Sequence, residues 1–122
     1  MIFSFRYSYI VLCVGIAAVF FWFGIDKFFH PAYWLDAWVP AWAVSGAATF
    51  GVTGTQFIYV NGILEVLIGL SLISGVFVRL FSALGVILLI AVLFVIGLNE
   101  IAVRDFGLIG GLLAVFLWPD RR

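Results

Sequence analysis

Three stretches of the sequence, 7–25, 57–78 and 80–98, are each about twenty residues long and almost entirely apolar. A helix rises 1.5 Å per residue, so about twenty apolar residues cross the ~30 Å hydrocarbon core of a bilayer. Inside a bilayer the backbone must satisfy its own hydrogen bonds, and a helix does this within a single segment. These stretches therefore predict membrane-spanning helices.

A fourth apolar stretch, 101–118, reaches spanning length only when Arg104 and Asp105 are included. Its uncharged part, 106–118, is too short to cross a bilayer alone. The links from the second stretch to the third, and from the third to the fourth, are only a few residues long, which forces antiparallel neighbours. We therefore expect an all-α, integral membrane four-helix bundle that forms one transmembrane domain over 1–122.

Composition excludes a soluble globular domain and several kinds of site. The chain is 66% hydrophobic and 10% charged, whereas globular proteins carry about 25% charged residues. Its net charge of zero gives no electrostatic footprint for nucleic acid, so we expect no nucleic-acid partner. His and Cys do not recur at ligand spacing, so we expect no metal and no protein-bound cofactor. The single cysteine, Cys13, is expected to be a small core or lipid-facing residue.

The segment 26–56 is the only long connection, and it divides into two halves. The first half is rich in aromatic residues and predicts a short interfacial helix, with Pro31 near its start and Pro40 at its end. The second half is rich in Gly, Thr and Ser and has turn character. Tryptophans at four-residue spacing favour a role as interfacial anchors, with a ligand platform as the alternative; they are Trp34, Trp38 and Trp42.

Basic residues predict the orientation in the cell membrane. The first stretch is too long for the hydrophobic region of a signal peptide, so we expect it to be retained as a span. With four spans, the side with both termini carries four basic residues, and the other side carries two that stand next to acids. Cytoplasmic loops are enriched in Lys and Arg, so we expect cytoplasmic termini and an external aromatic segment. The first group is Arg6, Arg79, Arg121 and Arg122, and the second is Lys27 and Arg104.

Glu65 lies in the middle of the second stretch, far in sequence from any other charge. An ionisable group at that depth costs about 2.5–3.5 kcal/mol on insertion scales and rarely faces lipid. Helical periodicity puts Asn61 on the same face, together with glycines that allow close packing. Arg104 is expected at the same depth, because each of the two charges lies about 21 Å from the cytoplasmic boundary. We therefore expect Glu65 and Arg104 to form an ion pair.

The flexible side chain of Lys27, at the outer end of the first stretch, is able to reach the same region. The sequence thus predicts a polar cluster in the outer part of the bundle, made of Lys27, Asn61, Glu65, Arg104 and Asp105. Two interpretations remain open: an ion-pair network that fixes helix register, or a binding or proton-handling site for a small or lipidic ligand. His30 is expected at the interface, as a surface residue or as a proton relay to Asp26 or Asp36.

The chain carries, in order, the segments FFWFGIDKFFHP, NGILEVLIGLSLISGVFVRLFSALG and RDFGLIGGLLAVFL. Together they resemble the DoxX-like membrane proteins over nearly the whole chain. The resemblance implies a four-helix membrane protein, and it matches the family at Gly24, Lys27, Gly62, Glu65, Arg104, Asp105 and Gly107. The family takes its name from a subunit of an archaeal thiosulfate:quinone oxidoreductase, and some members are linked to respiratory or redox-stress membrane complexes. The resemblance therefore implies a redox-associated role.

Three functions are compatible with these features. The first is a membrane subunit of a redox or respiratory system, which binds a quinone or lipid near Glu65 and Arg104 and works with a soluble partner. The second is a non-catalytic scaffold or accessory subunit of a membrane complex. The third is a carrier of small solutes or lipids that acts as a homo-oligomer. The first function predicts a side opening lined by the charged cluster and by aromatic residues such as Trp22 or Phe28, whereas a scaffold predicts no cavity.

Overall fold

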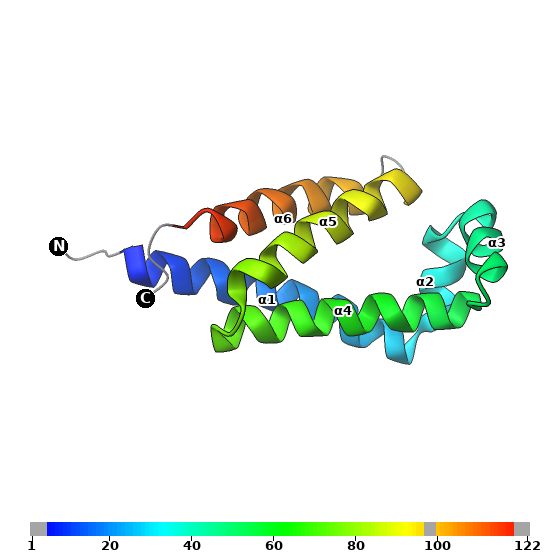
Figure 1. The fold of residues 1–122 in the computed structure, drawn as a ribbon, viewed down its shortest axis with the longest axis horizontal. Coiled ribbons are helices and arrows are strands. Elements are labelled where there is room, and N and C mark those ends of the chain that lie inside the picture. Colours follow the sequence, from blue (N-terminus) through cyan, green and yellow to red (C-terminus); the bar gives the residue numbers. More distant parts are fainter. Residues whose placement is uncertain (1–4, 97–99, 119–122) are drawn as a thin grey trace.

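The computed structural model describes residues 5–96 and 100–118, and every regular element in these ranges is an α-helix. The all-α class expected from the sequence is confirmed (Figure 1). In chain order the helices are α1 (Phe5–Phe29), α2 (Pro31–Trp38), α3 (Ala41–Thr49), α4 (Gly54–Ser74), α5 (Val78–Ile96) and α6 (Glu100–Phe116).

The long helices form two pairs that meet at one end (Figure 1). α1 packs mainly on α4, and α5 packs mainly on α6. The pairs meet where α4 turns into α5, which we call the turn end, and they diverge toward the end that carries α2 and α3, the α2–α3 end. At the turn end, the rings of Tyr9 and Trp118 have centroids 5.3 Å apart, and the Arg79 guanidinium lies 6.0 Å from the ring of Phe116. The first contact joins the segment just beyond α6 to α1, and the second joins the last turn of α6 to α5.

Three helical segments are long and apolar enough to cross a membrane: Arg6–Phe29 in α1, the whole of α4, and Val78–Val95 in α5. α6 has 17 residues and contains Arg104 and Asp105, and it is not among these segments in the described ranges. Large apolar side chains are exposed along all three segments, as on a surface that faces lipid. The chain therefore has the character of an integral membrane protein.

Local sequence signals define both ends of α4. At its start, Thr53 and Gln56 form a capping box, in which each side chain accepts a hydrogen bond from the backbone N–H of the other. At its end, Gly75 adopts φ 79°, a left-handed conformation that favours glycine. The helix therefore begins and ends earlier than the predicted 57–78, and the turn to α5 lies at 75–77.

The connection 26–56 contains more helix than expected. α1 continues to Phe29, so Asp26 and Lys27 are helical residues. α2 starts at Pro31, as the sequence predicts, because the missing N–H of proline costs nothing in a first helical turn. After Pro40, α3 runs through Ser, Gly and Thr positions that were expected to form turns. Its alanines favour helix, and internal hydrogen bonding of the backbone is favoured in apolar surroundings.

Apolar side chains fill the interior nearer the turn end. Phe20, Ile68 and Leu112, from three different helices, are at most 2% exposed, and Cys13 belongs to the same core. Nearer the α2–α3 end, the backbones of α1 and α4 approach closely. A Cβ atom added to Gly62 would lie 2.9 Å from the carbonyl oxygen of a glycine on α1. This close approach brings the polar side chains of the two helices together.

Candidate functional site

A cavity of about 330 Å³ lies between α4 and α5 toward the α2–α3 end. Its walls are mostly apolar and include Leu64 of α4 and Leu88 and Val92 of α5. Aromatic rings come from Trp34 and Phe57. Its polar lining comes from α1, α4 and α6 and consists of Lys27, Asn61, Glu65, Arg104 and Asp105. Apolar walls with a few convergent polar groups are typical of a site for a small ligand.

Lys27 and Glu65 form an ion pair between α1 and α4. Glu65 is buried and Lys27 is nearly so, with 8% and 11% of their side-chain surface exposed. Gly24 and Gly62 each lie three residues before one of the partners, and they allow the two backbones to approach at this level. A buried charge is tolerated only when it is paired. Each residue of this ion pair therefore depends on the other.

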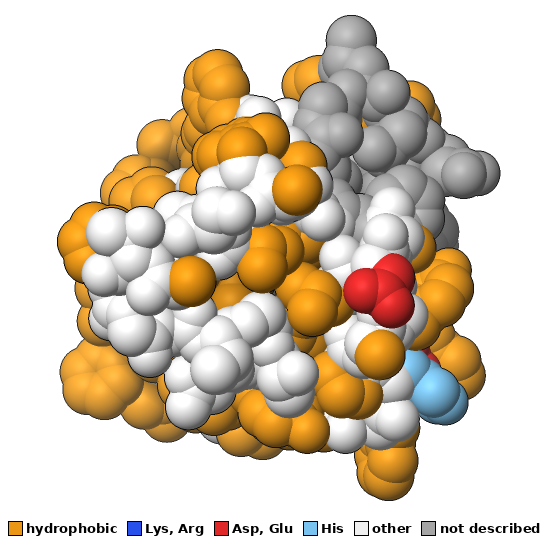
Figure 2. Space-filling model, turned by 90° about the vertical axis from the view of Figure 1, so that its right-hand side faces the viewer, with side chains coloured by type: hydrophobic (Ala, Val, Ile, Leu, Met, Phe, Trp, Pro, Cys, Tyr) orange, Lys and Arg blue, Asp and Glu red, His pale blue; other side chains and the backbone are white. Residues whose placement is uncertain are grey.

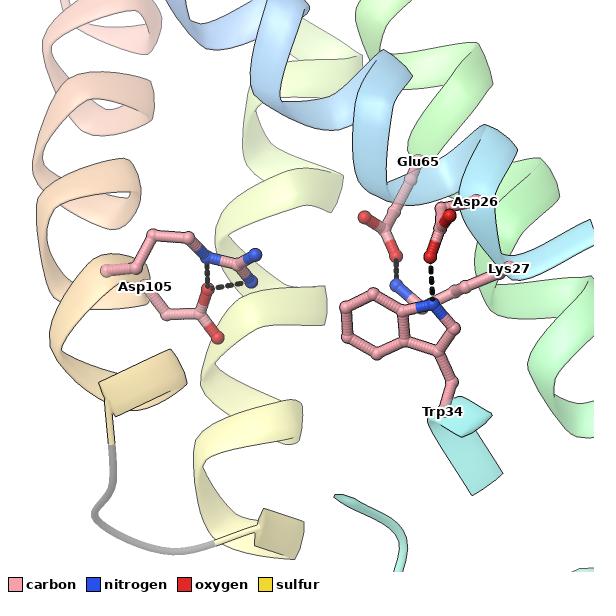
Figure 3. A network of polar contacts seen from close by, with 6 residues as sticks. Asp26, Lys27, Trp34, Glu65 and Asp105 are labelled. Carbon is pink, nitrogen blue, oxygen red and sulfur yellow. Dashed lines mark hydrogen bonds and ion pairs between the residues drawn. The ribbon is translucent and has the colours of Figure 1, made fainter. Parts of the chain in front are cut away.

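Trp34 of α2 covers this ion pair, and Asp26 fixes its position (Figure 3). The indole Nε1–H of Trp34 donates to Asp26 Oδ2 at 2.8 Å, and His30 Nδ1 lies 3.0 Å from Asp26 Oδ1. The Nζ atom of Lys27 lies 4.8 Å from the centroid of the Trp34 ring. A cation is attracted to an aromatic face. α2 is thereby held against the end of α1 and closes one side of the cavity.

Arg104 and Asp105 form a second charge pair on α6, opposite the first in Figure 3. Arg104 Nε and Nη2 donate to Asp105 Oδ1 at 3.0 and 2.6 Å. The guanidinium carbon lies 4.1 Å from the ring centroid of Phe23 on α1, so α6 is also anchored to α1 here. Arg104 Nη1 and Asp105 Oδ2 are both buried and have no hydrogen-bond partner in the described ranges.

All five residues of the predicted polar cluster line the same cavity, but their pairing differs from the expectation. Glu65 was expected to pair with Arg104. In the structure Glu65 pairs with Lys27, and Arg104 pairs with Asp105. The position of a residue along its helix predicts its depth in the membrane. It does not predict the direction in which the side chain points around the helix axis. Asn61 lines the cavity, and no hydrogen bond joins it to the charged residues within the described part of the chain.

The three tryptophans predicted as interfacial anchors have different surroundings. Trp34 is 7% exposed and points inward, whereas Trp42 on α3 is 63% exposed. The side chain of Trp38 lies outside the described part of the structure. The sequence favoured interfacial anchoring for Trp34 and left a ligand platform as the alternative, and the structure places its ring in the cavity lining. The four-residue spacing predicts the contact of His30 with Asp26. The contact of Trp34 with Asp26 depends on the break between α1 and α2, which Pro31 marks in the sequence but whose direction the spacing does not reveal.

Two further aromatic residues were expected at the opening of the site and do not line the cavity. Trp22 is 72% exposed on the outer face of α1. Phe28 stacks on Tyr59 with centroids 5.5 Å apart. The aromatic lining thus comes from α2 and the start of α4 instead of from the outer face of α1.

Comparison with known proteins supplies no template for this site. No family model, curated protein or solved structure matches the chain. Among residues 5–96 and 100–118, no group of three or more His, Cys, Asp or Glu side chains is placed to hold a metal ion. The four charges of the two pairs cancel, so the site suits an uncharged ligand that is oriented by hydrogen bonds.

Proposed function

We propose that this protein is a membrane subunit of a redox system and that it binds a quinone or a similar lipid-soluble molecule in the cavity between α4 and α5. The observation behind the proposal is the lining of that cavity, which joins apolar walls to two charge pairs. A ring-shaped head group stacks near Trp34 and forms hydrogen bonds at the charged side. Its apolar tail lies along the walls formed by α4 and α5.

The redox part of this proposal rests on the resemblance to the DoxX-like membrane proteins. The resemblance includes the positions that line the cavity, namely Lys27, Glu65, Arg104 and Asp105. A lipid-soluble redox carrier supplies the electron chemistry, and the protein supplies binding and orientation. We propose that a soluble partner exchanges electrons with the bound molecule.

We further propose four spans with both termini in the cytoplasm. α6 packs on α5, and Trp118 beyond its end contacts Tyr9 of α1, so α6 accompanies the other long helices to the turn end. Arg6 lies beside the end of α4 at this turn end. Figure 2 views the α2–α3 end, where the described surface shows acidic and His side chains and no Lys or Arg. This distribution supports a cytoplasmic turn end.

A non-catalytic scaffold is the alternative from another functional class. The charge pairs are compatible with a scaffold, because ion pairs alone fix helix register. A subunit that serves only to pack against a partner has no use for a cavity beside these pairs. A carrier needs a path to both membrane faces, and Phe20, Ile68 and Leu112 fill the interior toward the turn end. The cavity therefore favours binding of a ligand from one side.

A binding experiment tests the proposal. Protein in phosphatidylcholine nanodiscs is titrated calorimetrically with one-isoprene ubiquinone and with its quinol, and protein-free discs give the background. Leu64→Trp places a large ring in the cavity lining, whereas Leu67→Trp adds the same ring to an exposed position of α4 outside the lining. We expect saturable binding to the wild type and to Leu67→Trp, and a loss of about tenfold or more in Leu64→Trp. Absence of saturable binding, or equal binding by both variants, contradicts the proposal.

A further inference from the structure

The charge pair on α6 leaves two polar atoms unused beside the cavity. Asp105 is fully buried, and its Oδ1 atom accepts both hydrogen bonds from Arg104. Asp105 Oδ2 and Arg104 Nη1 have no partner among the described residues. A buried polar atom without a partner carries a desolvation penalty. A molecule in the cavity that pairs with these atoms therefore gains affinity.

These two atoms define the hydrogen-bonding groups of the ligand. A carboxylate oxygen only accepts hydrogen bonds, so Asp105 Oδ2 requires a donor. A guanidinium nitrogen only donates, so Arg104 Nη1 requires an acceptor. The oxygens of a quinone head are all acceptors, whereas a hydroquinone offers hydroxyl donors together with oxygen acceptors.

The ammonium and indole donors elsewhere in the lining are already engaged, and the Asn61 amide forms no hydrogen bond to Asp105 Oδ2 within the described residues. The ammonium group of Lys27 pairs with Glu65, and the indole N–H of Trp34 donates to Asp26. The requirement of Asp105 for a donor is therefore met most directly by a bound molecule. We propose that the cavity selects a ring that bears hydroxyl groups, of the hydroquinone or phenol class, over the corresponding carbonyl form. This inference rests on the proposed function and specifies the redox state that the site binds.

Three ligands of nearly equal size test the inference on the unmodified protein. They are one-isoprene ubiquinol, its quinone, and the dimethyl ether of the quinol, each titrated anaerobically into phosphatidylcholine nanodiscs. Only the quinol donates hydrogen bonds, while all three accept them. We expect the quinol to bind about tenfold or more tightly than the other two, because a hydrogen bond to a charged group is among the stronger ones.

A variant reverses the requirement without changing the size of the side chain. In Asp105→Asn the amide oxygen takes the Oδ1 position, because both hydrogen bonds from Arg104 need an acceptor there. The amide NH₂ then replaces Oδ2 and donates to the ligand. We expect the preference to move toward the quinone. Asp36→Asn makes the same change on α2 outside the cavity lining and should leave the preference unchanged.

The outcomes separate the inference from the proposed function. Equal affinity of the wild type for all three ligands, or tighter binding of the quinone, overturns the selection of hydroxyl groups and leaves the proposed function standing. Saturable binding of none of the three overturns both. Because the comparison of ligands uses the wild type, the inference is decided even where Asp105→Asn fails to fold.

Discussion

Two charge pairs at the same cavity have different structural roles. Lys27 and Glu65 belong to different helices, so their ion pair joins α1 to α4. Arg104 and Asp105 are neighbours on α6, and their hydrogen bonds orient the guanidinium without linking two helices. Loss of one partner from the first pair leaves an isolated charge inside a helix interface. Substitutions in the Lys27–Glu65 pair should therefore lower the stability of the protein, whereas substitution of Asp105 should alter its ligand preference.

The Lys27–Glu65 pair should show strong coupling in a double-mutant cycle. Glu65→Leu alone leaves the Lys27 ammonium buried without a partner, and we expect a loss of about 3 kcal/mol in the free energy of unfolding. Lys27→Met combined with Glu65→Leu removes both charges and should recover the free energy to within about 1 kcal/mol of the wild type. Unfolding by SDS in mixed micelles measures both values. Additive losses in the double variant would show that the two residues act independently.

Trp34 and Trp42 form a matched pair of residues for the same substitution. Trp34→Phe removes the indole N–H that donates to Asp26, and we expect a loss of about 1 kcal/mol in the free energy of unfolding. The loss is modest for a hydrogen bond to a carboxylate, because Asp26 is partly exposed to solvent. Trp42 is 63% exposed, so Trp42→Phe should leave the thermal midpoint of the detergent-solubilised protein unchanged. Equal shifts for the two variants would contradict the inward role of Trp34.

At the scale of the helices, apolar runs predicted where segments exist but not how they pair. The runs 57–78 and 80–98 correspond to α4 and α5, because uninterrupted hydrophobicity is a property of one segment alone. α3 was missed, since a Gly/Ser/Thr composition favours turns in water but not in apolar surroundings. The dominant packing of α1 on α4 depends on two glycines that meet across the interface, which a single segment does not reveal.

The close approach of α1 and α4 gives a prediction at this scale. Gly62→Ala places a Cβ atom 2.9 Å from a backbone oxygen of α1, so the helices must separate, and we expect a loss of about 1–3 kcal/mol in stability. Gly15 lies on α1 with no atom within 4 Å of an added Cβ, so Gly15→Ala should be neutral or slightly stabilising. Thermal denaturation in detergent compares the two variants. Equal stability of both would show that the helices are not in contact at Gly62.

At the scale of the whole molecule, the site depends on how the two helix pairs diverge. The sequence identified five charged or polar residues that now line one cavity, because isolated charges in apolar segments stand out in any composition. It did not identify their partners or the role of Trp34, since both depend on the rotation of each helix and on the return of α2 toward α1. Charged residues in apolar segments thus indicate where the site lies, whereas the packing of the helices determines which of these residues interact.

Membrane topology decides whether α6 completes a four-helix bundle. In a background of Cys13→Ala, single cysteines are introduced by Asp36→Cys, Val76→Cys and Leu117→Cys, and intact cells are treated with a membrane-impermeant maleimide. All three positions are exposed in the structure.

Four spans with cytoplasmic termini predict labelling of the first variant only, with the other two labelled after the membrane is permeabilised. If α6 does not cross, Leu117→Cys is labelled together with Asp36→Cys. Labelling of Val76→Cys in intact cells would instead reverse the proposed orientation. The contact between Tyr9 and Trp118 places the end of α6 beside the start of α1, so the four-span pattern is the one we expect.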